Sequence, residues 1–173
     1  MNFDQTSAEC HVFTYKDGLL SRVGHDLKLR CDRFQGVLKP DRVEVNFDAS
    51  AWTVVGALRD GRVNPGALSS KDERQIVDNI RKGVLHPDRF PKIRFTSTAL
   101  RREPRELNIE GTLELHGVTK PIVARARQVD KHYLAEVELH TPDFGIPPFT
   151  ALLGTLKVKP KVKVRLSIPL PAP

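Results

Sequence analysis

The side chains of this chain that could carry chemistry are few and scattered. No two of its six histidines are spaced i, i+4 on a predicted helix, and no cluster of histidine and cysteine has the spacing of a zinc site. The sequence has no Gly-x-Ser-x-Gly elbow, and its glycines form no phosphate-binding loop. We therefore predict no catalytic residue, no metal ligand and no cofactor, and we expect a protein that is not an enzyme.

Two polar residues, His25 and Ser97, lie in phase with apolar neighbours. In an unbroken strand His25 points to the same side as Leu27, and Asp26 points to the opposite side, so these neighbours cannot form a catalytic dyad. A bulge at Gly24 would reverse this orientation. Two roles stay open for His25, contact with a ligand head group or a hydrogen bond within the core, and Ser97 either meets a ligand or bonds a backbone carbonyl.

Alternation of apolar and polar side chains with period two recurs along the chain and predicts strands with one face in a core. The clearest run is 156–168, where even positions are apolar or proline and odd positions from 157 to 165 are cationic. Turn residues at 17–18, 39–41 and 130–131 make neighbouring strands antiparallel. The runs predict about eight or nine strands, near residues 11–16, 19–31, 34–39, 43–50, 92–101, 107–116, 121–129, 132–140 and 155–168.

One helix is predicted between Ser70 and Gly83. Ser70 and Glu73 have the spacing of a capping box, and apolar residues then recur on one helical face until Gly83 ends the helix. Glycine, proline and small residues are frequent in 57–69 and 141–153, which predicts two long connections. We expect the helix to cover the mouth or the side of a barrel built by the strands.

Two segments of the chain resemble the signature of the YceI-like family. They are HPDRFPKIRFTST at 86–98 and GTLELHGVTKP at 111–121, with DFGI at 143–146 as a further match. The resemblance, which extends from Gly18 to the final strand, implies an antiparallel barrel that encloses a long isoprenoid or fatty-acid-like chain. With the strand pattern, it leads us to expect an all-β fold in one domain, residues 1–173: an antiparallel lipocalin-like β-barrel of about eight strands with one α-helix inserted.

A barrel of this size is either filled by its own side chains or holds one small ligand, and the periodicity permits both. The resemblance favours a hollow barrel, so we expect non-catalytic binding, transport or storage of a long-chain amphiphilic lipid, polyisoprenoid or fatty-acid-like. The alternatives are a ligand-free interaction module that contacts nucleic acid or protein through a basic outer face, and a hydrolase that uses His25. Parity and size select the expected lumen residues: Phe13, His25, Leu27, Leu29, Phe47, Trp52, Phe95, Ser97, Leu113, Leu115, Val158, Val164 and Leu166.

The net charge of +7 raises the question of an anionic partner. Acidic residues are interspersed along the chain, and cations concentrate at 157–165, which contains no aromatic residue of the kind that single-strand binders interleave with cations. We therefore expect no nucleic-acid partner. The basic stripe is a solvated outer face, a protected sheet edge or a docking surface, and transient contact with an anionic membrane surface is one expectation. A homodimer is suggested by the family resemblance alone.

The first nine residues lack the basic and apolar parts of a secretory signal. We expect a cytoplasmic protein, or a periplasmic one if a leader has been removed. No apolar run reaches the roughly 18 residues of a transmembrane helix. Cys10 and Cys31 are expected to be buried free thiols, with a disulfide between them as the alternative in an oxidising compartment.

Overall fold

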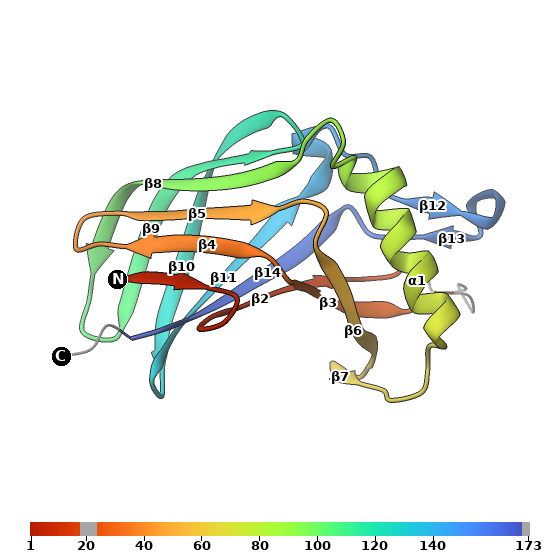
Figure 1. The fold of residues 1–173 in the computed structure, drawn as a ribbon, viewed down its shortest axis with the longest axis horizontal. Helices are drawn as coiled ribbons and strands as arrows, with labels where there is room; N and C mark the ends of the chain where they lie inside the picture. The colour runs from red at the N-terminus through yellow and green to blue at the C-terminus, as the bar shows by residue number, and fades with distance from the viewer. Residues whose placement is uncertain (18–23, 171–173) are drawn as a thin grey trace.

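A curled antiparallel sheet of 12 strands forms most of the molecule, and it is accompanied by a sheet of two strands (Figure 1). The computed structural model describes residues 1–17 and 24–170, so Gly18 of the predicted first turn and residues 19–23 of the predicted second strand lie outside it. The large sheet has the order β1-β4-β5-β8-β9-β10-β11-β14-β2-β3-β6-β7, and the small one joins β12 to β13. The bounds are β1 (Asn2–Asp4), β2 (Glu9–Thr14), β3 (Asp26–Cys31), β4 (Phe34–Leu38), β5 (Val43–Asp48), β6 (Trp52–Arg59), β7 (Arg62–Val63), α1 (Ser70–Asn79), a π-helical turn (Ile80–Leu85), β8 (Lys92–Arg102), β9 (Glu106–Leu115), β10 (Val118–Val129), β11 (His132–His140), a 3₁₀ turn (Thr141–Phe144), β12 (Thr150–Ala151), a 3₁₀ turn (Leu152–Gly154), β13 (Leu156–Lys157) and β14 (Lys161–Pro169).

The predicted alternation is visible in the strands themselves. Along β9 every second residue is buried, from Leu107 to Leu115, and the residues between them are half-buried or exposed. Side chains of a strand point alternately to its two faces, so this pattern gives the sheet one apolar inner face and one polar outer face. The expected all-β fold with one inserted α-helix is confirmed.

The sheet curls because the two halves of one long, bent hairpin lie near opposite ends of the strand order. Strand β3 pairs with β6 near one end of the strand order, and β4, which follows β3 in the chain, pairs with β5 near the other end. Backbone hydrogen bonds cross the bend between these two halves, from Asp32 N to Ala51 O (2.8 Å) and from Asp48 N to Arg33 O (3.0 Å). The hairpin from β3 to β6 therefore wraps the sheet around its apolar face.

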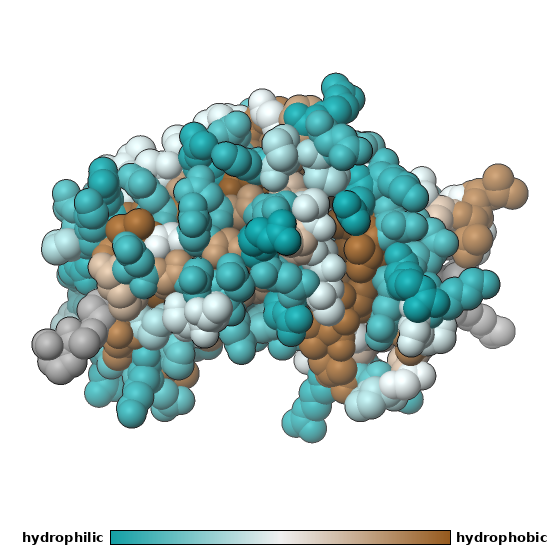
Figure 2. Space-filling model, in the orientation of Figure 1, coloured by the Kyte–Doolittle hydropathy of each residue, from teal (hydrophilic) through white to brown (hydrophobic). Residues whose placement is uncertain are grey.

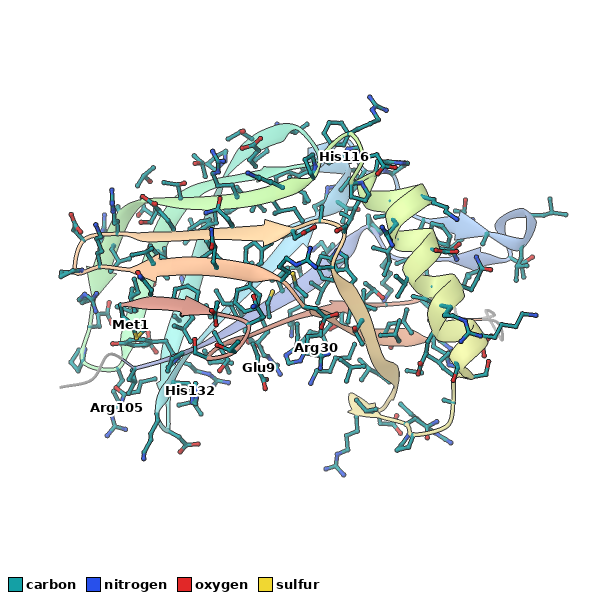
Figure 3. The ribbon with its side chains drawn as sticks, viewed as in Figure 1. Met1, Glu9, Arg30, Arg105, His116 and His132 are labelled. Carbon is teal, nitrogen blue, oxygen red and sulfur yellow. The ribbon has the colours of Figure 1, made fainter. Side chains whose placement is uncertain are left out.

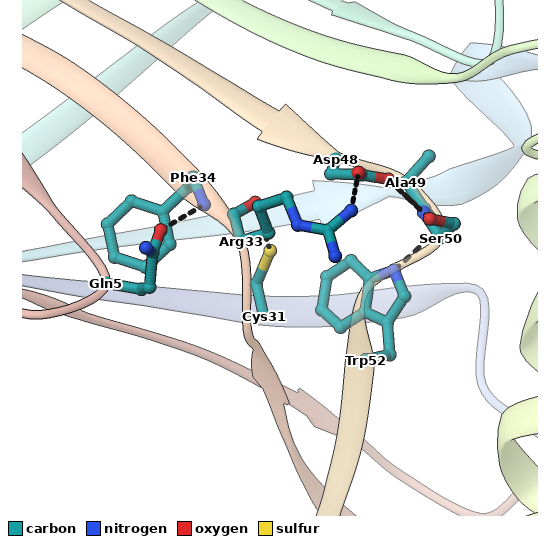
Figure 4. A network of polar contacts seen from close by, with 8 residues as sticks. All are labelled: Gln5, Cys31, Arg33, Phe34, Asp48, Ala49, Ser50 and Trp52. Carbon is teal, nitrogen blue, oxygen red and sulfur yellow. Dashed lines mark hydrogen bonds and ion pairs between the residues drawn. The ribbon is translucent and has the colours of Figure 1, made fainter.

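Side chains fix this bend, which we call the corner and which comprises residues 32–33 and 49–51 (Figure 4). Arg33 Nη1 donates to Asp48 Oδ2 (2.8 Å), and the backbone N–H and the hydroxyl of Ser50 donate to Asp48 Oδ1 (2.8 and 2.6 Å). The indole N–H of Trp52 donates to Ala49 O (2.9 Å). One carboxylate thus holds both chains of the bent hairpin.

The N-cap of the predicted helix lies one residue earlier than expected, and helical structure continues past the predicted end in a π-helical turn. Its capping box uses Ser69 and Asp72, each donating to or accepting from the other, instead of Ser70 and Glu73. Both pairs have the same spacing, and the extended backbone of Ser69 makes it the cap. Gly83 lies inside the π-helical turn and does not end the helix. No helix in the described ranges has the length and apolar character needed to cross a bilayer.

The predicted strand at 155–168 is interrupted. Strand β13 ends at Lys157 and β14 begins at Lys161, with Pro160 between them, because proline has no N–H to donate to a sheet. Strand β6 was missed, since the predicted strand at 43–50 ends before it and residues 57–69 were predicted to be a connection. The main sheet has 12 strands and not eight or nine because the short edge strands β1 and β7, and β6, which continues β5 beyond the corner, were not predicted.

We predict that Asp48→Ala lowers the free energy of unfolding by roughly 1–2 kcal/mol at neutral pH, because three hydrogen bonds to a partly exposed carboxylate are lost. Hydrogen bonds from Ser50, then the Arg33 guanidinium, lower the pKa of Asp48 in the folded protein. A lowered pKa stabilises the fold above the ordinary pKa of about 4, and this contribution disappears as the pH falls through the folded value. Urea unfolding at pH 7 and pH 3 should show a difference between variant and parent that shrinks in acid.

Asp41→Ala is the matched control, since Asp41 is an exposed carboxylate in the turn between β4 and β5. It should leave the unfolding free energy within about 0.5 kcal/mol of the parent. Equal effects of the two variants would contradict the role given to the corner.

Candidate functional site

A large hollow lies inside the curled sheet. Its volume is about 910 Å³, within the range of roughly 300–1,000 Å³ that is usual for small-molecule sites. Strands β2 to β6, β8 to β11 and β14 all contribute side chains to its wall, and most of these side chains are apolar. The interior is therefore hollow and is not filled by its own side chains, which decides between the two alternatives that the periodicity left open.

Eleven of the thirteen predicted lumen residues line this cavity. They come from the strands on all sides of the sheet and from the segments next to β3 and β13. They are His25, Leu27, Leu29, Phe47, Trp52, Phe95, Leu113, Leu115, Val158, Val164 and Leu166.

The lumen assignment of Phe13 is wrong. Its neighbours Val12 and Thr14 line the cavity, so Phe13 points to the outer face of β2. It is buried there because Arg165 covers it, with the guanidinium carbon 4.9 Å from the ring centre. Size favoured Phe13 in the prediction, but strand parity decides the face.

Ser97 also does not line the cavity. The backbone N–H of Val43 donates to Ser97 Oγ (2.7 Å), just beyond the last paired residues of β5 and β8, Glu44 and Thr96. The hydroxyl thus extends the hydrogen bonding between the two strands by one position. Of the two roles left open for Ser97, the structure shows the hydrogen bond to the backbone. The partner is an amide and not the expected carbonyl.

His25 lies at the mouth of the cavity and is exposed, so it is not a core histidine. Strand β3 begins only at Asp26, and Gly24 has the left-handed φ of +100° that ends the extended run. Asp26 is turned away, accepting a hydrogen bond from the backbone N–H of Lys16 (2.9 Å). Hydrogen bonds from Ser69, followed by smaller effects that include His25, lower the pKa of Asp72 across the mouth.

Polar side chains that sequence reasoning missed gather at the same mouth. Asp72, Gln75 and Asn79 of α1 line the cavity, and Gln75 Nε2 donates to Asn79 Oδ1 (3.0 Å). Their spacing of three and four residues places them on one helical face, a signal that the sequence contained. Lys159 joins them because the break at Pro160 ends the alternation that predicted an outward side chain.

The opposite end of the cavity is apolar and is walled partly by small residues. Ala124, Ala126 and Ala135 leave space there that larger side chains would fill. Beside α1, apolar side chains form a strip that reaches the surface next to β6 (Figure 2). The cavity thus has one polar, accessible end and one deep apolar end, an arrangement that can hold an elongated amphiphile.

His116 of the recognised motifs, labelled in Figure 3, packs against two other residues of these motifs. The ring of His116 lies 4.3 Å from that of Phe90 and 5.5 Å from that of His86, measured between centres. Gly117 has φ +75°, and a Cβ there would lie 2.7 Å from Phe90. Burial, then the neighbouring His86, lowers the pKa of His116, so its imidazole is neutral near pH 7. The motif packs the turn between β9 and β10 against the segment before β8.

Cys10 and Cys31 are buried free thiols on adjacent strands, as expected. His11 pairs with Arg30, so the two cysteines come next on the same face of β2 and β3. Burial raises the pKa of Cys31 to about 11, and burial raises the pKa of Cys10 further. Within the part of the chain that the structure describes, no group of three or more His, Cys, Asp or Glu side chains could hold a metal ion.

We predict that both thiols of the folded protein react slowly with a disulfide reagent at pH 8. With a pKa of about 11, only about a thousandth of the Cys31 thiol is ionised, and the thiolate is the reactive form. Absorbance of the released thiolate should show both cysteines reacting rapidly only after unfolding in guanidinium chloride. Rapid labelling of the folded protein would contradict this burial, and no labelling after unfolding would indicate a disulfide.

Comparison with known proteins gives both a family and a fold. A model of the YceI-like domain matches residues 11–170. Protein YceI of Salmonella arizonae is 46% identical over 43 residues, which are 25% of this chain and 22% of that protein, so the match spans about a fifth of the relative's length.

Solved structures agree over longer stretches. Burkholderia cenocepacia BcnA superimposes with a TM-score of 0.64 and 13% identity, over 95% of this chain and 96% of that chain. A polyisoprenoid binding domain from Saccharophagus degradans, described as implicated in plant cell wall breakdown, gives a TM-score of 0.60 and 13% identity, over 92% and 91%. At these identities the similarity establishes the fold.

Proposed function

Since this chain belongs to the YceI-like family, we propose that it binds one long-chain amphiphilic lipid, of the polyisoprenoid or fatty-acid class, in the hollow of its sheet without transforming it. The observation that carries the proposal is the cavity of about 910 Å³ with an apolar interior and a polar mouth. A solved structure of the same fold is described as a polyisoprenoid binding domain, which supports the ligand class.

The apolar wall supplies the affinity in this proposal. Each methylene group moved from water into the cavity contributes about 0.8 kcal/mol, so a long tail binds far more tightly than a short one. The head group stays at the mouth, where Asp72, Gln75 and Asn79 of α1 line the cavity together with His25 and Lys159. An occupant with a charged or hydroxylated head keeps that group hydrated while its tail is buried.

The outer face gives no support to the alternative function, a ligand-free module that contacts nucleic acid or protein. Two cations of the basic stripe are paired across β11: Lys161 Nζ lies 2.9 Å from Glu138 Oε1, and Arg165 Nη2 lies 2.7 Å from Glu136 Oε1. These pairs reduce the positive potential that a nucleic acid would meet. A hydrolase that uses His25 likewise receives no support from Asp26, whose carboxylate accepts a hydrogen bond from the backbone N–H of Lys16.

Trp52 provides a direct test, because it is the sole tryptophan of the chain and lines the cavity. Titration with a polyprenyl phosphate or a long-chain fatty acid should shift and saturate the Trp52 emission as the tail displaces water around the indole. Native mass spectrometry of the same samples should show one lipid per chain. A short-chain acid is the control and should produce no saturable change; the same absence with the long chains, in both measurements, would exclude the proposal.

We predict that Ala135→Phe shortens the space for the tail and weakens binding of the longest ligands about 30-fold, equivalent to roughly 2 kcal/mol or two to three methylene groups. Ala135 lines the deep part of the cavity, whereas its neighbour Leu134 points to the other face of β11. Leu134→Phe is therefore the matched control and should bind like the parent. Shorter ligands should lose less affinity in Ala135→Phe, and equal losses for all chain lengths would contradict a tail in the cavity.

A further inference from the structure

A small hairpin projects from the molecule beside α1 (Figure 1). Strands β12 and β13 form its stem, with Thr150 opposite Lys157 and Ala151 opposite Leu156. The tip carries two leucines, and their side chains are exposed: Leu152 to 62% and Leu153 to 108%, the value of an extended peptide. The end of the hairpin is correspondingly hydrophobic in Figure 2.

The backbone of the tip is also unfavourable for these residues. Leu152 and Leu153 have φ angles of +53° and +55°, in the left-handed region that leucine rarely adopts, and Gly154 follows with +84°. Exposure of two large apolar side chains and a left-handed backbone both lower the stability of the isolated protein. Folding alone therefore gives no reason for two leucines at this position.

The root of the hairpin, by contrast, is firmly packed and belongs to the cavity. A Cβ on Gly24 would lie 2.3 Å from Leu156 Cδ1, so the side chain of Leu156 rests directly on this glycine. The backbone N–H of Val158 donates to Phe149 O (3.0 Å). Ala151, Leu152 and Leu156 all line the cavity, so apolar surface continues from the tip of the hairpin into the hollow.

Cationic side chains surround the root of the hairpin. Lys157 and Lys159 are exposed on the hairpin and just after it, and Lys16 forms a β-bridge with Val158. Two acidic residues are close by: Asp17, whose backbone N–H donates to Lys157 O (2.8 Å), and Asp26, which accepts from the backbone N–H of Lys16 (2.9 Å). An apolar tip with cations behind it matches the boundary of an anionic bilayer, where apolar groups enter the acyl region and cations meet the head groups.

We infer that the tip of this hairpin inserts Leu152 and Leu153 into an anionic lipid bilayer and holds the cavity mouth against the membrane. The uptake of a lipid from the membrane rests on the proposed function, whereas the docking of the hairpin does not. A lipid tail then passes from the bilayer along Leu152 and Leu156 into the hollow without crossing water. This surface combines the cations Lys157 and Lys159 with an apolar anchor that sequence periodicity did not reveal.

The test uses Leu152→Asn/Leu153→Asn, because asparagine tolerates the left-handed backbone and removes the apolar side chains. Val123→Asn is the matched control, since Val123 is an exposed valine (60%) in β10. Co-sedimentation with vesicles of phosphatidylcholine and phosphatidylglycerol should show partitioning of the double variant reduced at least about tenfold and that of the control unchanged. Lys157→Glu/Lys159→Glu should weaken partitioning on these vesicles at low salt and not on phosphatidylcholine alone.

Two further measurements separate docking from cargo binding. Uptake of a polyprenyl phosphate from vesicles, followed by Trp52 emission, should slow in Leu153→Asn, because Leu153 does not line the cavity, while the affinity of this variant for the same lipid delivered from dilute detergent should equal that of the parent. Unchanged partitioning of the double leucine variant would overturn the docking even if the cavity binds lipid. Parent protein that partitions but binds no lipid by either delivery would contradict the proposed function alone. A change of oligomeric state in light scattering, without a change in partitioning, would make the tip a contact between copies and overturn the inference.

Discussion

The enclosure of the cavity depends on the corner, where a single hairpin bends and so belongs to both ends of the same sheet. A curled sheet with a hollow interior has no continuous packed core, so side chains that line the hollow lack part of the dispersion contacts of an ordinary interior. Backbone hydrogen bonds across the bend and the Asp48 carboxylate, which holds Arg33 and Ser50, supply the constraint instead. Apolar packing is divided between clusters, one around residues such as Phe3 and Val45 and another around residues such as Leu115 and Phe144.

The polar and apolar groups of the cavity are separated along its length, and this separation follows from the type of element at each end. Strands contribute one face each to the interior, so their inward residues are mostly apolar. Helix α1 and the first residue of the π-helical turn contribute a face on which Ile76 and Ile80 alternate with Asp72, Gln75 and Asn79. The mouth is therefore the place where polar side chains can approach an occupant, and it is also where the hairpin of β12 and β13 begins.

Period-two alternation predicted most strands and eleven of the lumen residues because side-chain direction in a strand is fixed by parity. The failures have separate physical causes. Phe13 was chosen for its size although Val12 shows the inward parity, and Lys159 changed face because Pro160 interrupts the strand. The volume of the hollow depends on how strongly the sheet curls, and the exposed leucines depend on the backbone of one tight turn; neither is encoded in a local pattern.

The helix over the mouth has a consequence for the protein's thermodynamics. No residue of α1 is buried, so the helix spans an empty space and is fixed mainly by its N-terminal cap and its neighbours β6 and the π-helical turn. An occupant would add apolar contacts to Ile76 and to Ile80, which already packs against a buried apolar cluster, so helix order and occupancy would be linked equilibria. The extent to which this segment opens, measured by hydrogen exchange of its amides, would then depend on the occupant as well as on the polypeptide.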